Sequence, residues 1–186
     1  MTVRIKLCGN KPLVFDTQDV KELRCQHRIV GALIGTLPRL PQQNAFLGLP
    51  LQLLPEELTL LVTKNIAIIG DSNNGKTWTY LNTKAELLRY KVFEHLWSRQ
   101  LYVTSGLKFG GDYLAYRGDP MRFHSHYIVS AKDRHEPMTG LDVIGMGRLA
   151  TNVKKTYVIA SPASDNDTDS DENSAVEVFS IEWAGF

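Results

Sequence analysis

GGDYLAYRGDPMRFHSHYIV, residues 110–129, is the stretch that decides the fold of this 186-residue chain. The segments on either side of RGDPMRF contain aromatic and β-branched residues in YLAY and YIV, as is typical of β-strands. Within that connection, Gly118 and Pro120 indicate a turn that folds the first strand back toward the second. The stretch therefore predicts two neighbouring strands, with Tyr116 at the end of the first and His124 eight residues later, at the start of the second.

The residues around these strands predict an α/β domain over 101–186. A strand is expected at 101–105, before a glycine-rich loop. After residue 131, apolar spacing predicts a helix over about 142–155. Further strands are expected at the positions 156–161 and 176–183.

A smaller α/β module is predicted at 1–75, before this domain. Its expected helices are TQDVKELRCQH, with Asp16 or Thr17 as N-cap, and PEELTLLVTKN, which begins with a proline. The strands expected around them are VRIKL, PLVF, ALIGTLP and IAIIG. Residues 76–100 are interpreted as an interlobe loop and a bridging helix. The predicted fold class is thus α/β (α+β), in two lobes.

Charge is segregated along the chain, although the formal net charge is only +1. From Lys76 to Lys155 there are 13 lysines and arginines against 7 acids, a net charge of +6, and the remainder carries −5. A basic half is the footprint expected for phosphate contacts, and it is equally common on solvated surfaces. Charge alone therefore leaves nucleic-acid binding open.

Two cysteines and the absence of long apolar runs restrict the class of protein. Cys8 and Cys25 form no CxxC pair, so neither a disulfide framework nor a zinc knuckle is supported, and a reducing compartment is expected. No apolar run approaches the roughly 20 residues that span a bilayer, and the start resembles no signal peptide. We expect a soluble, intracellular protein with no membrane partner.

A tyrosine, a histidine and a lysine suffice for RNA cleavage because the substrate supplies its own nucleophile, the 2′-hydroxyl. Histidine, with an ordinary pKa of ~6.5, suits His124 as the general acid that protonates the leaving 5′-oxygen. Tyrosine, with an ordinary pKa of ~10, needs a nearby cation to act as a base. Lys155 could supply that charge to Tyr116 and also contact the phosphate. Each residue taken alone fits an ordinary packing role, and no metal or cofactor is required.

In order and setting, these residues resemble the tRNA-splicing endonuclease family. The resemblance covers about 101–183, through YLAYRGDPMRFHSHYIV, GLDVIGMGRLATNVKKTYVIA and SIEW, with weaker support from LLPEELTLL. It is strongest to the subunit that cleaves at the 3′ splice site. It implies a restriction-endonuclease-like catalytic domain behind a small N-terminal module, with Tyr116, His124 and Lys155 as the catalytic triad.

The resemblance also implies partners and a second substrate contact. Precursor tRNA is the expected substrate, cut to a 2′,3′-cyclic phosphate and a 5′-hydroxyl. Other endonuclease subunits are expected to complete a heterotetramer, with the nucleus as the expected location, although the sequence does not decide between nucleus and cytoplasm. Arg148 and Trp183 match an RNA-binding pair that sandwiches a substrate base at the partner catalytic subunit's cut site. An ordinary helix-surface charge and a core tryptophan are the alternatives.

Two other functions stay open on the sequence. GDSNNGKT at 70–77 satisfies the phosphate-loop pattern GxxxxGK[ST], with Lys76 as its lysine, and predicts a helix beginning at Gly75. Trp78 and the residues after it argue against that helix. The other alternative is a non-catalytic, RNA-binding scaffold subunit.

Metal sites are not supported by the sequence. His124 and His126 share one face of a strand but lack a third ligand with suitable spacing. The acidic run at 164–174 departs from a calcium loop at its sixth and twelfth positions and is interpreted as a solvated loop, with plugging of a basic pocket on a neighbouring subunit as the alternative.

Overall fold

The computed structural model describes residues 2–36, 47–70, 78–163 and 176–183, which fall into two compact units. The first unit spans Met1–Tyr80 and the second spans Leu81–Phe186. The helix interpreted as a bridge between lobes belongs to the second unit. Within the part of the chain that is described, no helix is long and apolar enough to cross a membrane.

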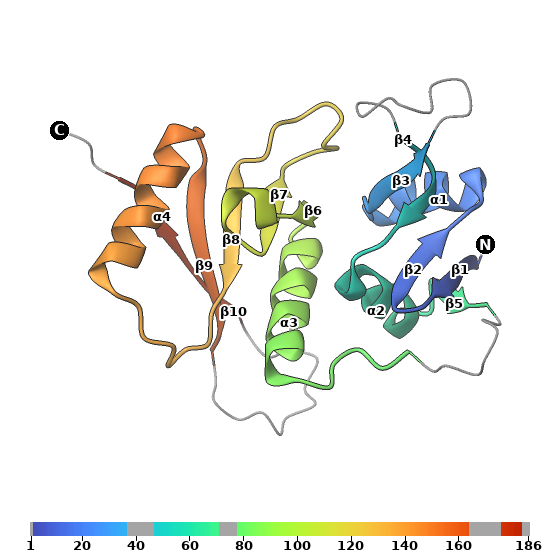
Figure 1. Cartoon of the computed structure of the whole chain (residues 1–186), viewed down its shortest axis with the longest axis horizontal. Helices are drawn as coiled ribbons and strands as arrows, with labels where there is room; N and C mark the ends of the chain where they lie inside the picture. The colour runs from blue at the N-terminus through green and yellow to red at the C-terminus, as the bar shows by residue number, and fades with distance from the viewer. Residues whose placement is uncertain (1, 37–46, 71–77, 164–175, 184–186) are drawn as a thin grey trace. The chain divides into compact units, whose positions relative to one another are not determined.

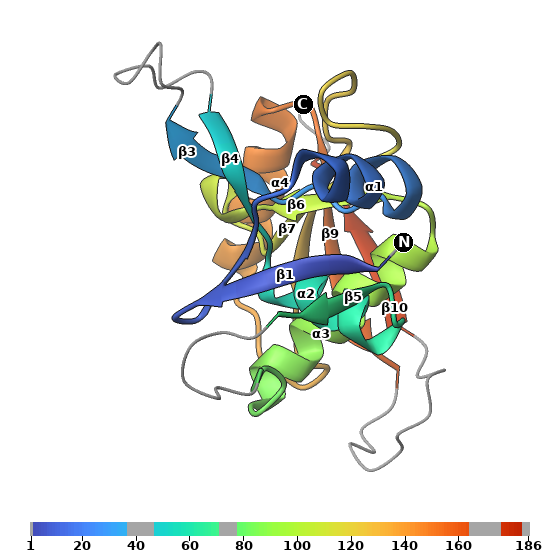
Figure 2. The same ribbon diagram turned by 90° about the vertical axis from the view of Figure 1, so that its right-hand side faces the viewer.

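In its described residues the first unit contains a five-stranded sheet and two helices, as its α/β pattern predicts (Figure 2). The strand order is β3-β4-β2-β1-β5, in which β1 and β5 are parallel and the other pairs antiparallel. Asp16 is the N-cap of α1 and accepts the N–H of Gln18 at 2.7 Å. The elements are β1 (Val3–Cys8), β2 (Lys11–Val14), α1 (Thr17–His27), β3 (Ala32–Thr36), β4 (Leu47–Gln52), α2 (Pro55–Thr63) and β5 (Ala67–Ile69).

The second unit is a five-stranded mixed sheet in the order β10-β9-β8-β7-β6. Among its described strands only β8 and β9 pair in parallel, and α4 makes the crossover between them, as a parallel connection requires. The elements are α3 (Lys84–Ser98), β6 (Tyr102–Ser105), the short 3₁₀ helix η1 (Leu107–Phe109), β7 (Tyr113–Tyr116), β8 (Tyr127–Ala131), α4 (Gly140–Asn152), β9 (Thr156–Pro162) and β10 (Val176–Ile181).

The two helices of this unit cover opposite faces of its sheet (Figure 1). Successive residues of a strand point to opposite faces. Tyr113 of β7 packs edge-on against Phe93 of α3. Its neighbour Leu114 belongs to a core cluster with Ala150 of α4, together with strand residues Ile128, Tyr157 and Ile159. The α3 and α4 sides of this sheet are therefore distinct.

Helix α4 is shifted relative to the helix predicted over 142–155. It begins earlier because Thr139 and Asp142 form a capping box, in which Thr139 Oγ1 accepts the Asp142 N–H at 3.2 Å and the Asp142 carboxylate accepts the Thr139 N–H at 2.8 Å. It ends at Asn152 because Lys154 adopts a left-handed conformation, with φ 53°.

The phosphate-loop hypothesis receives no structural support from the residues beyond the loop. Lys76 and most of GDSNNGKT lie outside the described residues. The segment 78–82 is not helical, however, and the next helix begins at Lys84. A helix running on from Gly75, as a phosphate loop needs, is therefore not present over the described part of that segment.

Candidate active site

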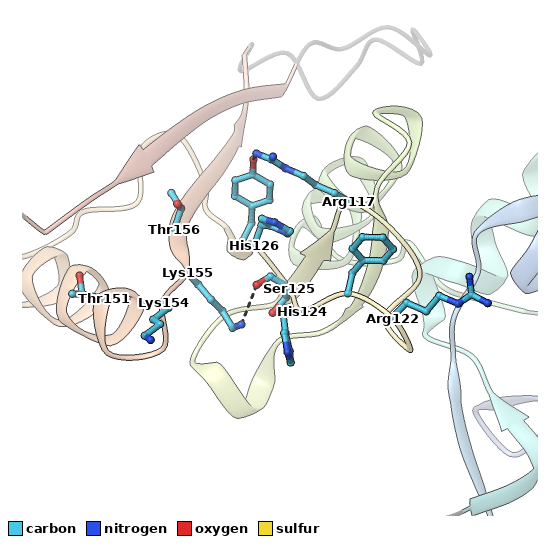
Figure 3. A pocket seen from close by; sticks show the side chains of 11 residues that line it. Arg117, Arg122, His124, Ser125, His126, Thr151, Lys154, Lys155 and Thr156 are labelled. Carbon is cyan, nitrogen blue, oxygen red and sulfur yellow. Dashed lines mark hydrogen bonds between the residues drawn. The ribbon is translucent and has the colours of Figure 1, made fainter.

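A pocket of about 690 Å³ lies in the second unit, and it is strongly basic (Figure 3). Six of its eleven lining residues are arginine, lysine or histidine, and none is aspartate or glutamate. Such a lining favours an anion. The lining residues are Arg117, Arg122, Phe123, His124, Ser125, His126, Tyr127, Thr151, Lys154, Lys155 and Thr156.

The connection between β7 and β8 presents His124 to this pocket. Asp119 organises its turn, because its backbone carbonyl accepts the N–H groups of Arg122 and Phe123 at 2.8 and 3.0 Å. The Phe123 ring packs closely over Gly118, where an added Cβ would lie 2.6 Å from two ring carbons. His124 itself is exposed, and its imidazole has no hydrogen-bond partner among the described residues. The ring is thus available to a bound substrate.

Backbone pairing places this connection beside the start of β9. The N–H of His126 donates to the carbonyl of Ala115 in β7 at 3.0 Å. The carbonyl of His126 accepts the N–H of Thr156 in β9 at 2.9 Å. Since His124 is two residues before His126 and Lys155 directly precedes Thr156, both reach the same pocket from distant parts of the sequence.

Lys155 is half-buried and held at two points. Its ammonium donates to the carbonyl of Ser125 at 3.0 Å and lies 5.5 Å from the centroid of the Phe109 ring. The loop that carries Phe109 is fixed in turn, because the Tyr157 hydroxyl donates to the carbonyl of Gly110 at 3.0 Å. Figure 3 shows the lysine pointing toward the connection that bears His124. The positive charge is therefore fixed next to the imidazole-bearing segment.

Tyr116 is not among the residues that line the pocket. Its half-buried side chain packs against the core cluster on the α4 side of the sheet. Phe109, whose ring contacts the Lys155 ammonium, packs against the same cluster. The Tyr116 hydroxyl accepts a hydrogen bond from Thr104 Oγ1 at 3.3 Å. The structure therefore brings His124 and Lys155 into one pocket, and Tyr116 lies on the α4 side of the sheet. Tyr116 directly follows Ala115, whose carbonyl accepts the N–H of His126 in the connection between β7 and β8.

Arg148 and Trp183 lie together, and neither is among the residues that line this pocket. The Arg148 guanidinium is 5.4 Å from the centroid of the Trp183 ring. The tryptophan is 39% exposed and lies beside Gly147, where an added Cβ would come within 3.4 Å of Trp183 Cβ. Both side chains are exposed to solvent among the described residues.

Several lining residues were missed by sequence reasoning, notably Arg117, Arg122, Thr151 and Lys154. The two arginines flank GDPM in the connection itself, so their proximity to His124 is a usable signal. Lys154 adjoins Lys155, but adjacent residues of a regular strand face opposite ways. In the described residues, no group of three or more histidine, cysteine, aspartate or glutamate side chains is placed to hold a metal ion.

Comparisons with known proteins cover both units. Residues 3–72 match the TSEN34-like N-terminal domain, and residues 87–171 match the catalytic C-terminal domain of tRNA intron endonuclease. A Schizosaccharomyces pombe protein named as a probable tRNA-splicing endonuclease subunit sen34 is 30% identical over 98% of this chain and 97% of its own length.

Other relatives carry the same name. The tRNA-splicing endonuclease subunit SEN34 of Saccharomyces cerevisiae is 28% identical over 94% of this chain and 99% of that protein. The mouse subunit Sen34 is 38% identical over 59% of this chain but only 32% of its own length. The similarity to the yeast proteins thus extends through both units.

Proposed function

The chain belongs to the tRNA-splicing endonuclease family and is a tRNA intron endonuclease subunit, and on that premise we propose that it makes the cut at the 3′ splice site of precursor tRNA. The observation that carries this proposal is that the imidazole of His124 and the ammonium of Lys155 line one basic pocket, whose described lining residues include no acidic side chain. The site suits a phosphodiester and supplies both a proton donor and a fixed positive charge.

The proposed reaction is a transfer within the RNA backbone that needs no metal. The 2′-oxygen forms a bond to the scissile phosphorus as Tyr116, acting as the phenolate, takes its proton, and the bond from phosphorus to the 5′-oxygen breaks as His124, acting as the imidazolium, donates a proton to that oxygen. Lys155 stabilises the negative charge that develops on the phosphate oxygens. The products are a 2′,3′-cyclic phosphate and a 5′-hydroxyl, so atoms and protons balance without a cofactor.

Arg148 and Trp183 are proposed to act at a different cut. In a heterotetramer with a second catalytic subunit, the pair would hold a substrate base at that subunit's site, the 5′ splice site. A base inserted between the two side chains needs a separation of roughly 7 Å, because it makes a van der Waals contact on each face. The distance of 5.4 Å from the Arg148 guanidinium to the centroid of the Trp183 ring therefore has to widen on binding. Base stacking on tryptophan and the charge of arginine stabilise that arrangement.

The decisive experiment replaces His124 by alanine in the endonuclease complex purified through this chain. Loss of general-acid catalysis should lower the rate of 3′ cleavage by roughly 10²–10⁴-fold. Cleavage at the 5′ splice site should persist, which serves as an internal control for assembly. Tyr116→Phe should give a loss of similar size if the phenol is the base, and single-turnover rates at each splice site measure both effects.

Substrate changes test the chemistry independently of the protein. Replacing the 2′-hydroxyl at the 3′ cut by hydrogen should abolish cleavage there, and EDTA should leave it intact. A His124→Ala complex that cuts the 3′ site at the wild-type rate would reject the proposal. That result would favour the non-catalytic, RNA-binding scaffold.

A further inference from the structure

Lys154 extends the basic pocket on the α4 side of Lys155 (Figure 3). It is exposed, and its ammonium has no hydrogen-bond or ion-pair partner among the described residues. Lys155, in contrast, already donates to the carbonyl of Ser125. The pocket therefore holds one cation fixed by the protein and a neighbouring cation that is free to bind an anion.

The end of helix α4 explains why two consecutive lysines reach one pocket. The N–H of Lys154 donates to the carbonyl of Thr151 at 3.1 Å, and that of Lys155 donates to the carbonyl of Ala150 at 2.9 Å. This is the Schellman motif, whose left-handed residue is usually glycine. Here that residue is Lys154, with φ 53°. The reversal of the chain at this residue allows its side chain and the next to line the same cavity.

The proposed reaction leaves this second charge without a role. Lys155 is assigned to the scissile phosphate in that reaction, and His124 lies on the other side of Lys155 from Lys154 in Figure 3. An RNA strand that crosses the pocket carries a phosphate on either side of the one that is cut. Because the ammonium is a point charge on a flexible stem, it can contact such a phosphate without a fixed angular geometry.

We propose that Lys154 is a substrate-positioning residue, which binds a phosphodiester flanking the cleaved one and so holds the RNA strand across the pocket. This inference rests on the proposed cleavage by His124 and Lys155. It assigns Lys154 to binding of the RNA backbone and not to the chemical step. Its removal should therefore raise KM and leave kcat nearly unchanged.

The test measures 3′ cleavage of precursor tRNA by the complex that carries Lys154→Ala. We expect KM to rise about 10-fold, the loss of one charged contact, with kcat within about 3-fold of wild type. The slope of log KM against log salt concentration should fall by about 1 because one phosphate contact is lost. Lys154→Arg should restore KM. An unchanged KM and salt slope in Lys154→Ala would overturn the proposal.

Glycine at the same position separates binding from folding. Lys154→Gly removes the cost of the left-handed conformation, so the Tm of the chain should rise by roughly 3 °C while KM rises as in the alanine variant. Gln100 is the matched control, because it occupies the equivalent left-handed position after α3, with φ 65°, and does not line this pocket. Gln100→Gly should raise Tm without changing KM. A similar KM change in both variants would overturn the proposal.

A modified substrate identifies the contact directly. Precursor tRNA with an uncharged methylphosphonate at one flanking position should be bound equally by the wild-type and Lys154→Ala complexes when that position is the contacted phosphate. A Lys154 effect that survives neutralisation of each flanking phosphate would contradict the assignment. The His124→Ala complex is assayed in parallel, and its kcat tests the proposed function separately. If its kcat stays at the wild-type value, the proposed function fails, whereas the KM of the Lys154→Ala complex still reports whether Lys154 binds the RNA backbone.

Discussion

Glu57, a buried carboxylate in the first unit, couples the fold to pH. Only 1% of the residue is exposed, and its carboxylate accepts three backbone N–H groups, from Val30, Gly31 and Leu54, at 2.8–3.1 Å. Burial raises the pKa of Glu57 from 4.5 to about 7, against the opposing effect of these donors. The side chain thus ties the segment after α1 to the start of α2.

We predict that this carboxyl makes the first unit less stable as pH rises from 5 to 8. Its folded pKa lies above its ordinary value, so its contribution is complete below about pH 4.5 and lost as pH passes through about 7. The expected loss is roughly 3 kcal/mol. Urea denaturation of the wild type and Glu57→Gln at each pH isolates the effect. Parallel stability curves for the two proteins would contradict this prediction.

At the scale of elements, the connection between β7 and β8 decides where the imidazole lies. Its turn is closed by Asp119, and its end is fixed by the hydrogen bond from His126 to Ala115. The position of Phe123 depends on Gly118, because any larger residue there meets the ring. The geometry next to His124 is therefore sensitive to a change that leaves both strands intact.

Gly118→Ala should reduce 3′ cleavage by about 10- to 100-fold, because the displaced Phe123 ring moves the adjacent imidazole. The Tm should change little, since Phe123 is half exposed. Gly145→Ala on α4 is the control: an added Cβ meets nothing within 4 Å there, so it should stabilise the chain by about 1 kcal/mol without slowing cleavage. Wild-type cleavage by Gly118→Ala would show that this packing does not position His124.

At the scale of the whole molecule, the chain presents two candidate sites for RNA, which share no residue. One is the basic pocket, and the other is the exposed pair of Arg148 and Trp183. In the multi-subunit endonuclease implied by the names of its relatives, they are proposed to serve different cuts. A mutation in the basic pocket should therefore impair the 3′ cut, and a mutation of Arg148 or Trp183 should impair the 5′ cut.

Trp183→Ala should lower cleavage at the 5′ splice site by roughly 5- to 150-fold, the loss expected for one stacked base, and leave 3′ cleavage nearly unchanged. Trp183→Phe, which keeps an aromatic face, should retain most of the activity. The measurement is the cleavage rate at each splice site of one precursor tRNA, compared between the Trp183 variants and the His124→Ala complex. Loss of the 3′ cut alone in Trp183→Ala would exclude a role at the other site.

The amino-acid sequence by itself determined the elements and the family. Alternating apolar residues, the proline at the start of α2 and the Thr83 cap of α3 are local signals, which act within a few residues, so they predict strands and helices well. The motifs around Tyr116, His124 and Lys155 indicated the family. Helix α4 was predicted with shifted ends because a left-handed lysine is a weaker stop signal than glycine.

Only the tertiary structure decided which charges share a pocket. The parallel pairing of β8 with β9 brings Lys155 beside a connection some thirty residues earlier, and no local pattern specifies that pairing. The same pairing, with the reversal at the end of α4, adds Lys154 to the site and leaves Tyr116 outside the pocket lining. Contacts between distant segments depend on the packing of the whole sheet, whereas periodicity and capping depend on neighbours in the chain.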